Sequence, residues 1–161
     1  MQEQDFPSLY RSADDLSLKS QKHFFQALRI HLVLLVIAAT LSIISIPHWL
    51  VALAQLLALL GALGCSIYLF SVRPDRMWYS GRAVAESIKT VTWRYVCRAE
   101  PFQTENLIAK NDFRQTLKQI IEQNREVCES LTEHLDGEQF TQVMEQLRSQ
   151  SLEERKATYK N

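Results

Sequence analysis

The chain has 161 residues with 18 basic and 18 acidic side chains, so its formal net charge is zero. This balance, and the lack of a basic run interleaved with aromatic residues, argue against a nucleic-acid-binding protein. None of the charges falls in the 43 residues between Arg29 and Arg73, so the remaining 118 residues are about 31% charged. The sequence therefore predicts two parts, one apolar and one strongly charged.

Residues 1–29 are predicted to be a cytosolic segment that leads into a helix. Their acidic residues and their lack of an early apolar core are not typical of a signal peptide. Residues 1–12 are predicted to be irregular, and Ser12 and Asp14 are expected to cap a helix that starts near residue 13. No Pro or Gly occurs from residue 8 to residue 46, so this helix is expected to continue into the apolar segment.

Residues 30–72 are predicted to be a transmembrane hairpin. A bilayer core about 30 Å thick takes about 20 helical residues to cross, so this segment covers two crossings. We expect the crossings at residues 30–46 and 49–72, with a tight turn around Pro47. His31, just inside the segment, is expected to extend its ring towards the interface.

Basic residues flank both outer ends of the hairpin, which predicts that both termini are cytoplasmic. These residues are Lys19, Lys22 and Arg29 before the first crossing, and Arg73, Arg76 and Arg82 after the second.

A ridge of small residues is predicted along the second crossing. Ala54, Ala58, Ala62 and Ser66 follow one another at intervals of four residues, and Gly61 lies beside them. Helices in lipid associate by close packing at small residues. The ridge is expected either to pack one crossing on the other or to pack neighbouring subunits as well.

A third helix is predicted over residues 75–99, ended by Pro101. It has an apolar face at helical spacing and a polar stripe along the flank of that face. In this stripe Glu86 is within reach of both Arg82 and Lys89, and Lys89 can stack on Trp93. The stripe is either a solvated surface, whose pairs contribute little, or a partly covered interface.

The region that follows is predicted to be a linker over residues 102–111 and then a long helix. Asp112 with Gln115 is expected to form a capping box that opens this helix, which would end near Leu135. Asn124 falls on its apolar stripe and could either fix the packing register or be solvated.

Two shorter helices are expected at the end of the chain. One is amphipathic and covers residues 140–147, and the other opens with a capping box of Ser151 and Glu154. Because the sequence ends inside this last helix, the cytosolic helical region 73–161 is predicted to be truncated at its C-terminus.

The sequence contains no catalytic constellation. Its four histidines are isolated, and it has no HExxH motif, no GxGxxG motif and no P-loop. We therefore expect no enzyme activity, no metal site and no cofactor. The residues predict an all-α membrane protein, with a two-helix transmembrane hairpin and a cytosolic helical bundle.

The segment after the hairpin carries an ordered set of residues, namely Trp78, Arg82, Ala85-Glu86-Ser87, Lys89 and Trp93-Arg94-Tyr95, followed by Pro101-Phe102. This order resembles the signature of SLATT domains, the two-transmembrane effector domains associated with bacterial nucleotide-signalling and defence systems. The opening Phe6-Pro7-Ser8-Leu9-Tyr10 and the closing Arg155 and Tyr159 are similar to one branch of that family. In that branch a second such region often follows, so the resemblance implies the N-terminal unit of a longer or tandem protein.

The resemblance implies a bacterial inner-membrane effector that forms a homo-oligomer and breaches the bilayer when triggered. The trigger would be an upstream nucleotide-second-messenger enzyme or sensor. The signature residues Arg82, Glu86, Lys89, Trp93, Arg94 and Tyr95 would then be structural or interface residues and not ligand-binding residues. One alternative is a non-conducting anchor that displays a helical interaction module. A second alternative is a soluble helical bundle, which would be extracted without detergent.

Overall fold

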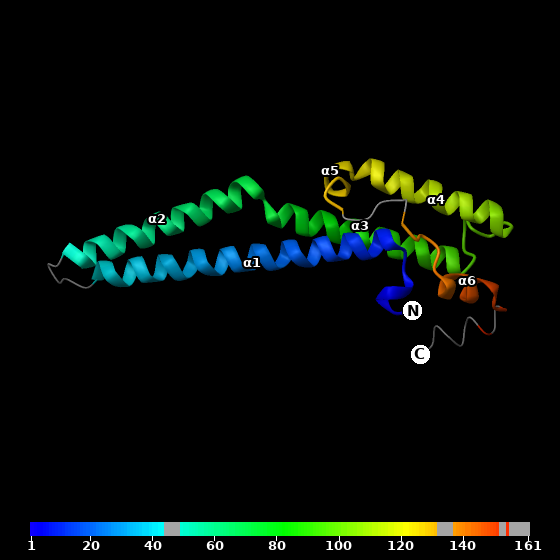
Figure 1. Ribbon diagram of the computed structural model, residues 1–161, viewed down its shortest axis with the longest axis horizontal. Helices are drawn as coiled ribbons and strands as arrows, with labels where there is room; N and C mark the ends of the chain where they lie inside the picture. The colour runs from blue at the N-terminus through cyan, green and yellow to red at the C-terminus, as the bar shows by residue number, and fades with distance from the viewer. Residues whose placement is uncertain (44–48, 132–136, 152–153, 155–161) are drawn as a thin grey trace. The chain divides into compact units, whose positions relative to one another are not determined.

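The computed structural model describes residues 1–43, 49–131, 137–151 and 154, and every regular element in these residues is helical (Figure 1). The all-α prediction is confirmed. The elements are the 3-10 turn η1 (Glu3–Asp5) and the helices α1 (Ser8–Ile43), α2 (Trp49–Val72), α3 (Pro74–Val96), α4 (Asn106–Gln123), α5 (Arg125–Cys128) and α6 (Gln142–Ser149).

The chain divides into two compact units. The hairpin unit is Leu18–Trp78, which extends beyond the charge-free residues 30–72 at both ends. The helical body comprises Met1–Ser17 and Tyr79–Asn161.

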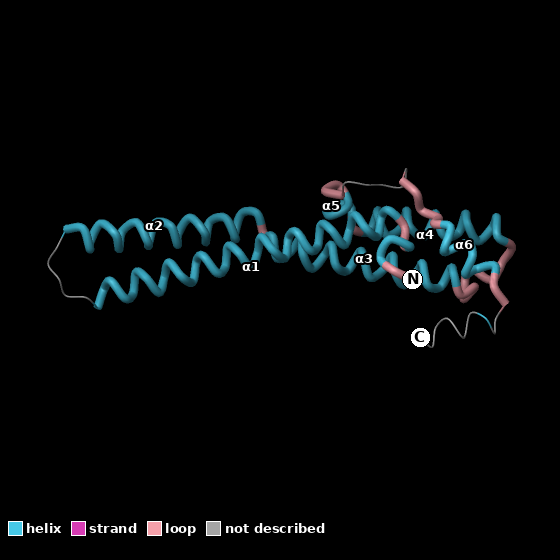
Figure 2. The backbone as a smooth tube through the Cα atoms, turned by 60° about the horizontal axis from the view of Figure 1, so that its bottom comes forward, coloured by secondary structure: helices cyan, strands magenta, loops and turns pink. Residues whose placement is uncertain are grey.

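In the hairpin unit, α1 and α2 run side by side (Figures 1 and 2). The 24 residues of α2 measure about 36 Å at 1.5 Å per residue, which is enough to cross a bilayer core of about 30 Å. The bounds of α2 are those predicted for the second crossing. α1 contains the first crossing as far as Ile43, and the turn predicted around Pro47 lies outside the described residues.

The start of α1 at Ser8 corrects the predicted start near residue 13. Ser12 and Asp14, which were expected to cap the helix, are buried inside it. Leu9 and Ala13 on the same turns belong to the core of the helical body. Most helical stability in proteins comes from such packing, so the helix extends past the residues with the strongest local capping preference.

The segment after α3 differs most from the prediction. Residues 102–111 were expected to be a linker, but α4 begins at Asn106. Asp112 therefore lies inside α4, where its main-chain carbonyl accepts a hydrogen bond from Thr116 Oγ1 at 2.8 Å. The expected capping box at Asp112 is wrong.

Asn124 explains why the long helix predicted to Leu135 is also wrong. α4 ends at Gln123, and the Asn124 side chain donates from Nδ2 to the Ile120 carbonyl at 2.9 Å. An Asn side chain that bonds to the nearby backbone competes with the helix for its hydrogen bonds. The residue therefore ends α4 and precedes the short α5.

The predicted amphipathic helix over residues 140–147 corresponds to α6, which begins at Gln142, and the capping box predicted for Ser151 and Glu154 is present. The Thr141 hydroxyl accepts from the Met144 N–H at 3.4 Å and caps α6. The Ser151 N–H donates to Glu154 Oε2 at 2.9 Å, and the Glu154 N–H donates to Ser151 Oγ at 3.4 Å, which is the predicted capping box. The Ser151 N–H and the Ser151 hydroxyl, which donates to the same Oε2 at 2.8 Å, lower the pKa of the Glu154 carboxyl below its ordinary value.

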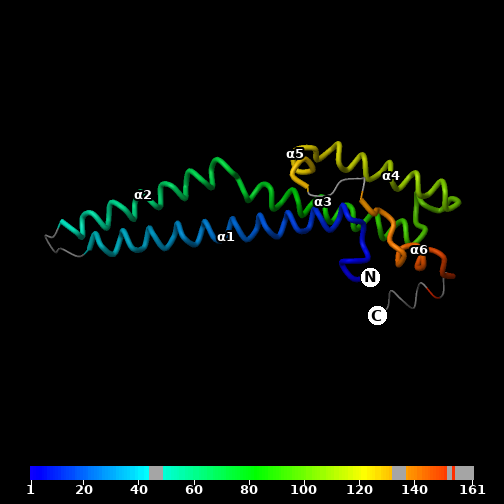
Figure 3. The backbone as a smooth tube through the Cα atoms, viewed as in Figure 1, coloured from blue at the N-terminus to red at the C-terminus, as the bar shows by residue number. Residues whose placement is uncertain are grey.

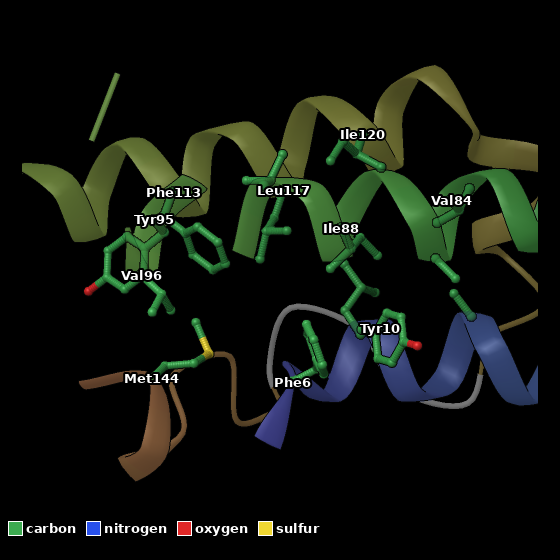
Figure 4. Packing of buried hydrophobic residues seen from close by; sticks show 14 of the residues in the cluster. Phe6, Tyr10, Val84, Ile88, Tyr95, Val96, Phe113, Leu117, Ile120 and Met144 are labelled. Carbon is green, nitrogen blue, oxygen red and sulfur yellow. The ribbon is translucent and has the colours of Figure 1, made fainter. Parts of the chain in front are cut away.

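The core of the helical body includes Phe6, which directly follows η1, and side chains from α1, α3, α4 and α6 (Figure 4). Its centre is an aromatic cluster in which ring centroids lie 4.9 to 6.0 Å apart, and the members are Tyr95, Phe102, Phe113 and Phe140. Figure 4 shows Met144 of α6 and Phe6 at the edge of this core.

Gly81 allows α1 and α3 to approach closely within the helical body. A Cβ atom at this position would lie 3.4 Å from both the Cβ and the main-chain nitrogen of Ser17. Gly81 is buried, and so is Ser17. These distances leave room for a Cβ atom in ordinary contact, and a side chain larger than that of alanine would press on Ser17.

Candidate functional site

The seam between α1 and α2 is built from small side chains, as the sequence predicted for helices in lipid. Ala38 of α1 and Ala58 and Ala62 of α2 are buried. A Cβ on Gly61 would lie 3.0 Å from Leu34 Cδ1, so the glycine permits this close contact.

The predicted small-residue ridge is divided between this seam and the exposed surface. Ala58 and Ala62 lie in the seam, Gly61 and Ser66 are half-buried, and Ala54 is exposed. Ala54 is therefore the member of the ridge that is available for contact with another helix.

His31 also joins the two helices of the hairpin. Its Nδ1 lies 3.0 Å from the Ala62 main-chain carbonyl, so the tautomer that carries a proton on Nδ1 donates to this oxygen. The expected extension towards the interface is not what the structure shows. The ring instead adds a polar link across the apolar seam.

Large apolar side chains cover the outer surface of the hairpin unit. In the most apolar 18-residue stretch of α1, and in the corresponding stretch of α2, only 11% of the residues are buried. The core helix of a soluble protein would be mostly buried. The exposed residues include Val36, Ile43, Leu57, Ile67 and Phe70, and such a surface matches the hydrocarbon of a bilayer.

The signature stripe on α3 begins with a three-residue charge cluster. Arg82 Nη2 lies 2.8 Å from Glu86 Oε1, as the spacing predicts, and Arg82 Nη1 lies 3.1 Å from Asp14 Oδ1 of α1. The second pair is the better shielded, because the Asp14 side chain is 12% exposed and that of Glu86 is 45% exposed. The sequence assigned Asp14 to a helix cap, so it missed this link between α1 and α3.

The other signature residues lie in different surroundings. Trp93 is half-buried and forms a T-shaped pair with Phe6, with the ring centroids 6.2 Å apart, and Arg94 Nε donates to the Glu100 carbonyl at 2.9 Å. Lys89 is half-buried, and its stacking on Trp93 stays a prediction. Tyr95 is fully buried in the aromatic cluster. Tyr95 and Trp93 therefore pack into the body, and the signature residues do not converge on one surface site.

Arg148 of α6 is a buried cation that sequence reasoning missed. Only 2% of the residue is exposed, and its guanidinium donates to the carbonyls of Tyr95 and Phe102 and to Asn106 Oδ1. Its Cζ also lies 4.5 Å from the centre of the Tyr95 ring. Figure 3 shows α6 beside the end of α3, where these carbonyls lie. A signal was present in the sequence, because Arg148 follows the apolar Met144 by four residues and so shares its helical face.

The Tyr95 hydroxyl is buried and, within the part of the chain that the structure describes, has no hydrogen-bond partner. Burial raises the pKa of this phenol above its ordinary value of 10.0, although the positive charge of Arg148 acts in the opposite direction. A buried hydroxyl without a partner lowers stability.

Residues 7–156 match the family model described as SMODS and SLOG-associating 2TM effector domain 3. The chain belongs to this SLATT family. The match covers the hairpin and nearly all of the helical body, and it confirms the family resemblance of the sequence. No curated protein and no solved structure matches the sequence.

The helical body of this SLATT chain has a groove between α3 and α4 with a volume of about 460 Å³. Three hydroxyls line it, those of Ser87, Thr90 and Thr116, and each donates to the carbonyl four residues earlier in its own helix at 2.8 Å. The charged residue on its lining is Glu86, so the groove is poorly suited to an anionic nucleotide.

Proposed function

We propose that this SLATT chain is a membrane effector of a bacterial defence system, located in the inner membrane with both termini in the cytoplasm. Several copies would assemble through their hairpins and breach the bilayer when an upstream nucleotide-signalling enzyme or sensor is activated. The family is one of two-transmembrane effector domains, which supports an effector role. The basic residues on both outer ends of the hairpin support the orientation.

The exposed apolar surface of the hairpin is the observation that carries this proposal. Two helices, each with only 11% of its most apolar stretch buried, have no protein covering their outer faces within the described residues. In a bilayer these faces contact lipid or further copies of the chain. A single two-helix hairpin encloses no water path, so a breach requires several hairpins.

Ala54 is the residue that best separates assembly between hairpins from folding of each hairpin. It is exposed, whereas Ala58 at the next position of the ridge is buried in the seam. A leucine at position 54 would hinder close packing between hairpins and leave the seam intact. A leucine at position 58 would overfill the seam itself.

The test is release of a small dye from liposomes that contain the purified full chain, with the oligomer mass measured in the same preparation. We expect the wild-type chain to release dye when the signalling partner is activated. Ala54→Leu should reduce both release and oligomer mass with unchanged helix content, and Ala58→Leu should disturb the hairpin as well. If an assembled wild-type oligomer releases no dye under any trigger, the chain is a membrane anchor and the proposal is wrong.

A further inference from the structure

A second feature of the hairpin unit is a groove with a volume of about 520 Å³ along one side of the two helices. One face of α1 lines it with His23, Gln26, Ala27 and Ile30, and one face of α2 lines it with Gly61, Gly64, Cys65 and Tyr68. Both sets have the spacing i, i+3, i+4, i+7, so each is a continuous strip along its helix.

The groove is polar at one end and apolar at the other. α1 and α2 are antiparallel, with Leu34 and His31 of α1 in contact with Gly61 and Ala62 of α2. Ile30 and Gly61 therefore mark the end of the groove inside the charge-free segment. His23 and Tyr68 mark the other end, and His23 lies outside that segment.

Gly64 keeps the groove open. A Cβ atom on Gly64 would meet no atom within 4 Å, whereas one on Gly61 would press against Leu34. The groove at Gly64 is therefore unfilled space, and the hairpin does not need a glycine there for its own packing.

Positive charge surrounds the polar end of the groove. The hairpin unit contains five basic residues and one acidic residue, Asp75, which gives it a net charge of +4. The basic residues are placed on both sides of the lining residues in the sequence: Lys19 and Lys22 precede those of α1, Arg29 is next to Ile30, and Arg73 and Arg76 follow those of α2. Lys19 precedes His23 by four residues and lies one turn beyond the groove, whereas Lys22 precedes Gln26 by four residues and lies directly beside His23 at the end of the groove; both are on its own side of α1.

We infer that this groove binds one anionic phospholipid from the leaflet at the charged end of the hairpin. The upper part of an acyl chain would lie along Ile30, Gly61 and Gly64. The phosphate would lie near His23 and Gln26, within reach of the lysine side chains. An anionic lipid has both features that the groove requires, an apolar chain and a negative head group, and each basic residue near a membrane surface favours anionic lipid by about fivefold (~1 kcal/mol). This inference does not depend on whether the hairpins permeabilise the membrane.

The test is lipid retention by the purified full chain in detergent. Phosphatidylglycerol and phosphatidylcholine with the same acyl chains are added in equal amounts, and the lipids that remain bound are counted by native mass spectrometry. We expect the wild-type chain to retain one phosphatidylglycerol in preference. Gly64→Leu fills the groove and should reduce this retention at least fivefold, whereas Gly64→Ala should preserve it.

A charge variant tests the head-group site without filling the groove. Lys22 is exposed and forms no ion pair with the residues that the structure describes, so Lys22→Gln should leave the fold unchanged and reduce phosphatidylglycerol retention about fivefold. Lys118→Gln makes the same charge change on an exposed position of α4 and should have no effect.

Three results would overturn the inference. The first is equal retention of the two lipids by the wild-type chain. The second is an equal effect of Lys118→Gln and Lys22→Gln, which would mean that net charge alone selects the lipid. The third is a Gly64→Leu chain with normal helix content and normal lipid retention but a smaller oligomer, which would assign the groove to a second copy of the chain.

Discussion

Replacing Arg148 by Met is expected to lower the free energy of unfolding of the helical body by about 3 kcal/mol. The guanidinium donates to the buried carbonyls of Tyr95 and Phe102, and no substitution of the arginine removes these acceptors. The Tyr95 carbonyl keeps one partner, the Arg98 N–H at 3.2 Å. Loss of the partner of a buried polar group costs about 1–3 kcal/mol, and loss of the contact with the Tyr95 ring adds about 1 kcal/mol. Removal of a desolvated cation offsets part of this cost.

The assay is urea unfolding of the full chain in detergent, followed by far-UV circular dichroism and by tryptophan fluorescence. Arg148→Lys keeps the charge but has three donors on a single nitrogen, so it should fall between the wild type and Arg148→Met. Arg125→Met is the matched control, because Arg125 is 84% exposed in its pair with Glu129 and should cost less than about 0.5 kcal/mol. If Arg148→Met and Arg125→Met lower stability equally, the buried guanidinium does not hold α6 to the body.

Four further substitutions test the contacts of α1 and α3. Tyr95→Phe removes a buried hydroxyl without a partner and should stabilise the body by about 1 kcal/mol in the same urea assay. Burial raises the pKa of Tyr95 in the folded state, so the un-ionised phenol favours the folded protein relative to an ionised one. This pH-dependent part of the stability is complete below pH 10 and is lost as the pH rises through the folded pKa. Tyr95→Phe should therefore lose less stability in alkaline buffer than the wild type. Asp14→Ala should cost more than Glu86→Ala in thermal melting, since Asp14 is the better shielded partner of Arg82; equal costs would contradict this ranking. Gly81→Val should cost about 1–3 kcal/mol, because its side chain would enter the close contact with Ser17, and an unchanged melting temperature would show that α1 and α3 can separate freely.

The sequence predicted the hairpin well because the membrane imposes simple requirements. A span needs about 20 apolar residues without charge, and this chain supplies 43 between two flanking arginines. The charge-free stretch gave the end of α2, and the turn expected around Pro47 gave its start. Which small residues form the seam was harder to predict. Ala54 and Ala58 are the same residue type on one ridge, and only the way the two helices cross decides that Ala58 is buried and Ala54 is exposed.

The helical body was predicted less well because its element boundaries depend on tertiary contacts. α1 starts early because Leu9 and Ala13 are buried against the body, although Ser12 and Asp14 favour a later start. α4 ends at Asn124 because a side chain bonds to the Ile120 carbonyl, which apolar periodicity does not reveal.

Charge pairing was predicted only where the partners are close in sequence. The spacing of Arg82 and Glu86 gave their ion pair, since residues four apart lie on one helix face. The Arg82–Asp14 pair joins residues 68 positions apart, and Arg148 bonds to carbonyls more than 40 positions away. Such contacts depend on how the helices pack, and no local pattern specifies them.

The composition of the hairpin limits the kind of breach that the proposed assembly would make. A water-filled path needs polar groups on its wall, but the charge-free segment offers few of them. Thr40 already donates its hydroxyl proton to the Val36 carbonyl at 2.8 Å. Gln55 and Ser66 are half-buried and Ser42 is exposed, and these three lie on different turns of the two helices. Assembled hairpins would therefore line a path mainly with Ala, Leu and Val side chains. In the proposed assembly such a path would be closed to ions while it is narrow and dry, and it would conduct only after the hairpins separate far enough for water to enter.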